Sequence, residues 1–75
     1  MNLMTANPLH RLTRHQRRIL RVMHESGWSY TDAARELQMP ESSVRNAVSR
    51  AIIRAGVKDR SALAYWLGHE DALTG

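Results

Sequence analysis

Residues 27–60 constrain the fold most strongly, because their pattern predicts two helices joined by a tight turn. Ser29 is a typical amino-terminal cap for the first of these helices. The Gln38-Met39 pair supplies the turn. Pro40 then begins the second helix, at a position where its missing backbone N–H would have no helical partner. We therefore expect the second helix to span residues 41–55.

The helix expected over residues 41–55 carries apolar side chains on one face only. At about 3.6 residues per turn, the apolar face comprises Val44, Val48, Ala51, Ile52 and Ala55. The opposite face comprises Ser42, Asn46, Ser49 and Ile53, with Arg45 and Arg50 on the two flanks. A short helix of this kind on a small basic body predicts a helix-turn-helix domain whose second helix enters the major groove of DNA.

Two further helices are expected, which makes the predicted fold all-α with four helices. Thr13 and Gln16 can form a capping box that opens the first helix, and Ser26-Gly27 ends it. Ser61 is the expected cap of a short last helix over residues 62–67, stopped by Gly68. The side chains expected to face the core from the first two helices are Ile19, Leu20, Val22, Met23, Ala33, Ala34 and Leu37.

The expected organisation is one domain with two irregular ends. Residues 1–11 show no periodic pattern and contain Asn7-Pro8, so we expect a flexible amino-terminal arm. Residues 12–68 form the predicted helix-turn-helix domain, and residues 69–75 form a frayed acidic tail.

Composition narrows the class of protein. The 75 residues include no cysteine, which excludes disulfides and thiolate metal sites, and the net charge of +4 favours a polyanionic partner. The four histidines lack zinc-finger spacing, and no catalytic cluster or phosphate-binding glycine loop is present, so we expect neither a metal, nor a cofactor, nor an enzyme.

No segment approaches the roughly 20 apolar residues that span a membrane, and the start of the chain lacks a signal core. We expect a cytoplasmic, nucleoid-associated protein.

From Leu12 to Leu67 the chain resembles the LuxR/GerE-type helix-turn-helix domain. The run from Gly56 to Ser61, which joins the second helix of the motif to the last helix, is the most specific match. The other matching residues are Leu12-Thr13, Ile19-Leu20-Arg21, Ser29, Ala34, Leu37, Ser43-Val44-Arg45-Asn46 and Val48-Ser49-Arg50. The resemblance implies a four-helix DNA-binding domain, often dimeric through its last helix. The chain also looks like the free-standing members of the family, which lack a sensory domain. We therefore expect its activity to depend on protein abundance or on a protein partner.

The chain also resembles the promoter-reading fourth region of small sigma factors. The residues that carry this second resemblance are Gly27-Trp28-Ser29-Tyr30, Met39-Pro40 and Ser43-Val44-Arg45. The two folds are similar, and the run from Gly56 to Ser61 favours the LuxR/GerE interpretation. The chain departs from the LuxR/GerE pattern at several positions. Pro40 stands where a serine cap is usual, Ala47 where a histidine is common, and Ile53 where a charged residue is usual. Ala33 and Ala55 replace larger apolar residues.

Candidate functional residues fall into three groups. Arginine can pair with guanine and asparagine with adenine, so the predicted base contacts are Arg45, Asn46 and Ser49. The predicted phosphate contacts are Ser42, Ser43, Arg50, Tyr30, Thr31, Lys58 and Arg14. The predicted contacts to a second protomer or a partner protein are Ala62, Tyr65, Trp66 and Ile53. A solvated basic surface and ordinary core packing are the simpler alternatives for these groups.

The predicted function is sequence-specific binding of double-stranded DNA by a bacterial or phage transcriptional regulator, acting as a homodimer on a two-part site. An alternative is a sigma-region-4-like or adaptor module that acts mainly by binding RNA polymerase, a sigma factor or another regulator. A third is the DNA-binding subunit of a recombination or packaging complex.

Overall fold

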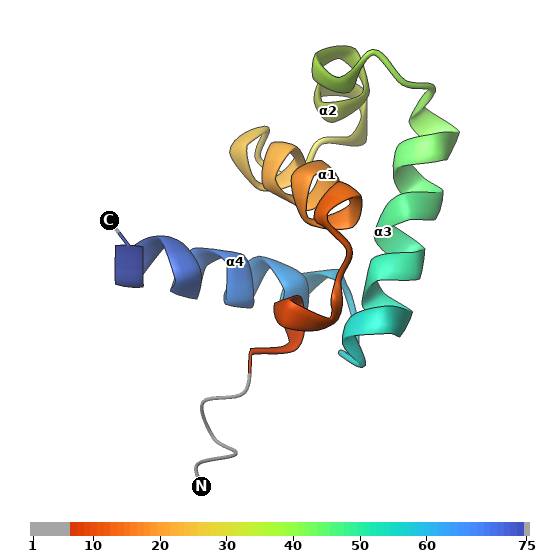
Figure 1. Ribbon diagram of the computed structural model, residues 1–75. Coiled ribbons are helices and arrows are strands. Elements are labelled where there is room, and N and C mark those ends of the chain that lie inside the picture. The colour runs from red at the N-terminus through yellow and green to blue at the C-terminus, as the bar shows by residue number, and fades with distance from the viewer. Residues whose placement is uncertain (1–6, 75) are drawn as a thin grey trace, which may run out of the picture.

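The computed structural model describes residues 7–74, and in this part of the chain all regular structure is helical (Figure 1). One short 3-10 helix precedes four α-helices. The elements are η2 (Pro8–Arg11), α1 (Arg14–Glu25), α2 (Tyr30–Leu37), α3 (Glu41–Ala55) and α4 (Arg60–Thr74). The predicted all-α, four-helix fold is confirmed, and α2, its turn and α3 form the helix-turn-helix unit. Figure 1 shows α3 along one edge of the molecule, while α4 runs away from it toward the opposite side.

The first two α-helices begin where their caps predict. The Gln16 backbone N–H donates to Thr13 Oγ1 at 3.1 Å, and the Thr13 backbone N–H donates to Gln16 Oε1 at 2.9 Å. Ser29 Oγ accepts from the backbone N–H of Asp32 at 3.2 Å. Each cap satisfies amide groups that a helix start leaves without an internal partner, so both predicted starts are confirmed.

The turn between α2 and α3 also forms where the sequence predicts it. Gln38 adopts the left-handed conformation (φ 56°, ψ 46°), and the Met39 N–H donates to the Ala34 carbonyl at 3.0 Å. Pro40 precedes α3 and gives it no side-chain cap, as expected. At its other end α3 stops at Gly56, whose φ of 72° is one that glycine adopts without steric cost.

The core lies where α1, α2 and α3 meet. Four residues of α3 are at most 1% exposed and form its buried face: Val44, Val48, Ala51 and Ala55. Ala33 of α2 is fully buried, and so small a side chain lets α2 and α3 approach closely. The rest of the core comprises Leu9, Leu12, Ile19, Leu20, Met23, Ala34, Leu63 and Leu67. Three residues expected in the core are only half-buried at its edge: Val22, Leu37 and Ile52.

The expected flexible arm is wrong for residues 8–11, and its residues 1–6 lie outside the described part of the chain. Asn7 caps η2 through its side chain, and Leu9 is 1% exposed. Arg11 links η2 to the end of α3 in two ways. Its Nη1 donates to the Ala55 carbonyl at 3.1 Å, and its own carbonyl accepts from Arg54 Nε at 2.6 Å. Burial of one leucine and these hydrogen bonds hold the segment against α3.

The last helix is longer than predicted at both ends. Asp59, and not Ser61, caps it: the Ala62 N–H donates to Asp59 Oδ1 at 3.1 Å. Gly68 does not end α4, which continues to Thr74. A Cβ added at Gly68 would lie 4.0 Å from the His24 ring, so the glycine sits against α1 within a continuous helix.

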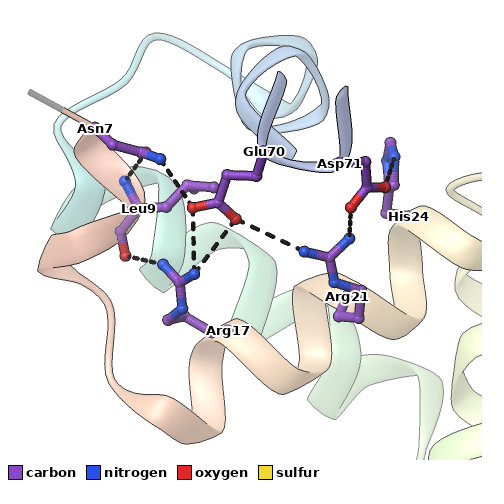
Figure 2. Close-up of polar contacts among 7 residues, drawn as sticks. All are labelled: Asn7, Leu9, Arg17, Arg21, His24, Glu70 and Asp71. Carbon is purple, nitrogen blue, oxygen red and sulfur yellow. Dashed lines mark hydrogen bonds and ion pairs between the residues drawn. The ribbon is translucent and has the colours of Figure 1, made fainter. Parts of the chain in front are cut away.

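Acidic residues near the end of α4 hold it against α1 and Asn7, in what we call the Glu70 cluster: Asn7, Arg17, Arg21, Glu70 and Asp71 (Figure 2). Glu70 Oε2 accepts from Asn7 Nδ2 at 2.8 Å and from Arg17 Nη2 at 3.2 Å. Arg21 lies 3.7 Å from Glu70 Oε1 and donates to Asp71 Oδ1 at 2.6 Å. The tail expected to fray after residue 68 is therefore helical through Thr74, and its carboxylates pair with arginines of α1.

We expect Glu70→Gln to lower the free energy of unfolding by about 1–2 kcal/mol, because the Glu70 side chain is only 16% exposed and accepts charge-assisted hydrogen bonds. Thermal and urea unfolding would measure the change. Amide hydrogen exchange should show faster opening of α4 beyond Gly68. Glu36→Gln, at an exposed residue of α2, is the matched control and should change stability by less than about 0.5 kcal/mol. Equal effects of the two variants would contradict a stabilising role for the Glu70 cluster.

Candidate nucleic-acid interface

The outward face of α3 is polar and accessible. Ser42, Asn46, Ser49 and Ile53 are exposed, as are Arg45 and Arg50 on the flanks, while Ser43 is half-buried. The arrangement follows from the burial of the opposite face, since a helix that packs through one side presents the other to water. The three predicted base contacts thus lie together on α3; whether they contact DNA stays a prediction.

Arg45 is held in place by two neighbours at the start of α2 and α3. Its Nη2 donates to Glu41 Oε1 at 3.2 Å, and its guanidinium carbon lies 4.3 Å from the centre of the Tyr30 ring. Glu41 Oε2 accepts from Thr31 Oγ1 at 3.0 Å, which ties the first turns of the two helices together. The Arg45 side chain is nevertheless 58% exposed, so it remains available to a ligand.

A second arginine reaches the same aromatic ring from α4. The Arg60 guanidinium carbon lies 5.3 Å from the Tyr30 ring centre and 5.9 Å from the Trp28 ring centre, within the range of cation–π attraction. Its Nη1 also donates to the Trp28 carbonyl at 3.4 Å. Sequence reasoning missed Arg60 and the role of Glu41. The spacing of Glu41 and Arg45, four residues apart on one helix, could have indicated their pairing.

On its other flank, α3 borders a groove shared with the start of α1. The groove brings together Ser43 and Arg50, two predicted phosphate contacts, and Asn46, a predicted base contact. Its full lining is Thr13, His15, Gln16, Ile19, Met39, Ser43, Asn46, Ala47 and Arg50. The other five predicted phosphate contacts do not line this groove. Arg14 lines a separate hollow with Arg17, Arg18 and Arg21. Lys58 is exposed in the loop after α3, and Ser42, Tyr30 and Thr31 lie in the first turns of α3 and α2.

The predicted partner contacts lie on two helices. On α4, Tyr65 is 66% exposed, whereas Trp66 packs against the core and Ala62 is half-buried. The Tyr65 and Trp66 rings meet edge to face at 5.5 Å. Ile53, on the outward face of α3, is 79% exposed. Only Tyr65 and Ile53 are large apolar side chains that the described residues leave open to a partner.

The described residues offer neither a metal site nor a membrane span. Nowhere in residues 7–74 do three or more His, Asp or Glu residues gather closely enough to hold a metal ion. No helix in the same part of the chain is long and apolar enough to cross a bilayer.

Fold and surface together define the class of protein: a helix-turn-helix domain whose second helix presents arginine, asparagine and serine side chains. The sequence model of the family "Sigma-70, region 4" matches residues 9–54, which is more than half of the chain. The chain belongs to that family. Region 4 is a DNA-binding helix-turn-helix domain that contacts promoter DNA and RNA polymerase.

The match bears on the choice between the two resemblances. It runs from Leu9 in η2 to Arg54 near the end of α3 and leaves α4 outside. The sigma-factor resemblance is confirmed, whereas the LuxR/GerE type is not. No curated protein and no solved structure matches the chain.

We expect Ile53→Lys to leave the fold intact, with a change in unfolding free energy within about 0.5 kcal/mol, because the isoleucine is 79% exposed. Val48→Lys is the contrasting variant on the same helix. Its side chain is 1% exposed, so it would bury an unpaired charge and unfold the domain. Thermal melts followed by circular dichroism compare the two. Similar loss of structure in both variants would show that the assigned outward face of α3 is wrong.

Proposed function

We propose that the protein binds duplex promoter DNA by placing α3 in the major groove, and that it acts in transcription without catalysis of its own. The observation that carries the proposal is the exposed, pre-oriented Arg45 beside Asn46 on the outward face of α3. Arginine can donate two hydrogen bonds to guanine, and asparagine can pair with adenine. Ser49, one turn further along, is the third proposed base contact.

Side chains around this face are proposed to hold the DNA backbone. Ser42 and Thr31 are exposed near the starts of α3 and α2, and Arg50 and Ser43 line the groove beside α1. Contacts of this kind fix the position of a helix on the duplex without selecting a base sequence. Family membership supports RNA polymerase as the protein partner.

A second candidate function is a LuxR/GerE-type regulator that dimerises through α4. The observation that favours it is Tyr65, which projects from α4 with 66% of its surface exposed. A region-4-like module and a dimeric regulator differ in the DNA they select. The first would select a single asymmetric half-site, and the second would select two half-sites related by two-fold symmetry.

Selection of bound duplexes from a random library tests the proposal and identifies the preferred site. We expect a single half-site bound by a monomer, with the mass of the complex measured by sedimentation. A two-fold symmetric site bound by two chains would support the dimeric regulator. The absence of any enriched sequence would contradict sequence-specific binding.

On the selected site, Arg45→Ala should cost about 1–3 kcal/mol and flatten preference at one base pair. Arg50→Ala should instead weaken binding to all duplexes about equally. It should also lower the slope of log affinity against log salt concentration by about one, because one fewer phosphate is neutralised. Affinity titrations at several salt concentrations measure both effects. Uniform loss in both variants would mean that Arg45 contacts phosphate and reads no base.

A further inference from the structure

The ring of Tyr30 is the meeting point of three helices. It lies in the first turn of α2, 4.3 Å from the guanidinium carbon of Arg45 on α3 and 5.3 Å from that of Arg60 on α4. The ring is itself half-buried and packs against the core. Its position is therefore set by the fold, whereas the two arginines are exposed side chains resting on it.

An exposed arginine ordinarily samples many rotamers and loses that freedom when it binds a ligand. Arg45 meets two restraints before any ligand arrives: the Tyr30 ring on one flank, and the Glu41 carboxylate at 3.2 Å. Glu41 is restrained in turn by Thr31 of α2. A planar guanidinium held this way can keep the orientation that paired hydrogen bonds to a base require.

We propose that Tyr30 is a positioning residue that sets the base preference of Arg45, and that Arg60 of α4 helps to hold the ring. The proposal rests on the proposed function, in which Arg45 reads a base. It gives Tyr30 a role different from the phosphate contact expected from its place at the start of α2. In the positioning role the aromatic face acts, whereas a side-chain contact with phosphate would use the hydroxyl.

The proposal also gives α4 a part in DNA recognition. Arg60 is the first residue of α4 and lies outside residues 9–54, which match the sigma region 4 family. It bridges Trp28 and Tyr30 and so links the start of α4 to the start of α2. The preference of α3 for its DNA site then depends on a contact that the family match does not cover.

Two substitutions of Tyr30 distinguish the role of its aromatic ring from that of its hydroxyl. Tyr30→Phe keeps the aromatic face and should retain both affinity and base preference. Tyr30→Leu removes the face and should reduce discrimination at the base pair read by Arg45 about 2- to 5-fold, as expected for loss of an exposed cation–π contact. Titration with the selected duplex and with single-base variants measures this ratio. If Tyr30→Phe weakens binding to all duplexes equally, the hydroxyl contacts phosphate and the positioning role is overturned.

A double-mutant cycle shows whether Tyr30 acts through Arg45. Arg45→Ala alone should lower discrimination roughly 5- to 150-fold at its base pair. In the Arg45→Ala background, Tyr30→Leu should have no further effect on base preference. A full additional effect there would overturn the inference. If Arg45→Ala leaves base preference unchanged, the proposed function itself fails at this residue, and the positioning role fails with it.

Arg60→Gln provides a test at an exposed residue, where folding is not at risk. It should reduce discrimination at the same base pair while leaving the salt dependence of binding unchanged, because Arg60 acts on the ring. A fall of about one in the salt slope, with base preference retained, would show a direct phosphate contact by Arg60 and overturn its positioning role.

Discussion

The close packing of α3 against α1 and α2 is the constraint on which the rest of the structure depends. Val44, Val48, Ala51 and Ala55 occupy one face of α3 and are at most 1% exposed, and the fully buried Ala33 of α2 leaves room for the two helices to approach. With that face committed to the core, Asn46 and its neighbours must face outward. The same packing brings the first turns of α2 and α3 together, so that Thr31, Glu41 and Arg45 become one connected group.

Local patterns in the sequence predicted the central part of the fold. The caps at Thr13 and Ser29, the turn after α2 and the end of α3 at Gly56 all depend on residues within a few positions of one another, and all are confirmed. The accessible face of α3 followed from the spacing of its apolar residues. The grouping of Arg45, Asn46 and Ser49 on one surface was therefore predictable, although their contacts with DNA remain a prediction.

The parts that sequence reasoning did not predict depend on residues far apart in the chain. Gly68 is a common stop signal, but Glu70 beyond it pairs with Arg17 of α1 and continues the helix. The sequence around Leu9 predicts an irregular arm, but Leu9 is buried because η2 packs against α3 and α4. The contact of Arg60 with Tyr30 likewise has no local signature. Tertiary contacts of this kind override the local signals by which glycine and proline predict the end of a helix or an irregular segment.

The most direct test of the central claim, that the outward face of α3 binds duplex DNA, is an NMR titration of the protein with its selected duplex. If this face binds DNA, backbone amide shifts should concentrate at residues 42–50 of α3 and at Tyr30 and Thr31. Amides near Tyr65 on α4 should change little. Shifts centred on α4, with α3 unaffected, would contradict the account and would place the nucleic-acid interface on a different face of the molecule.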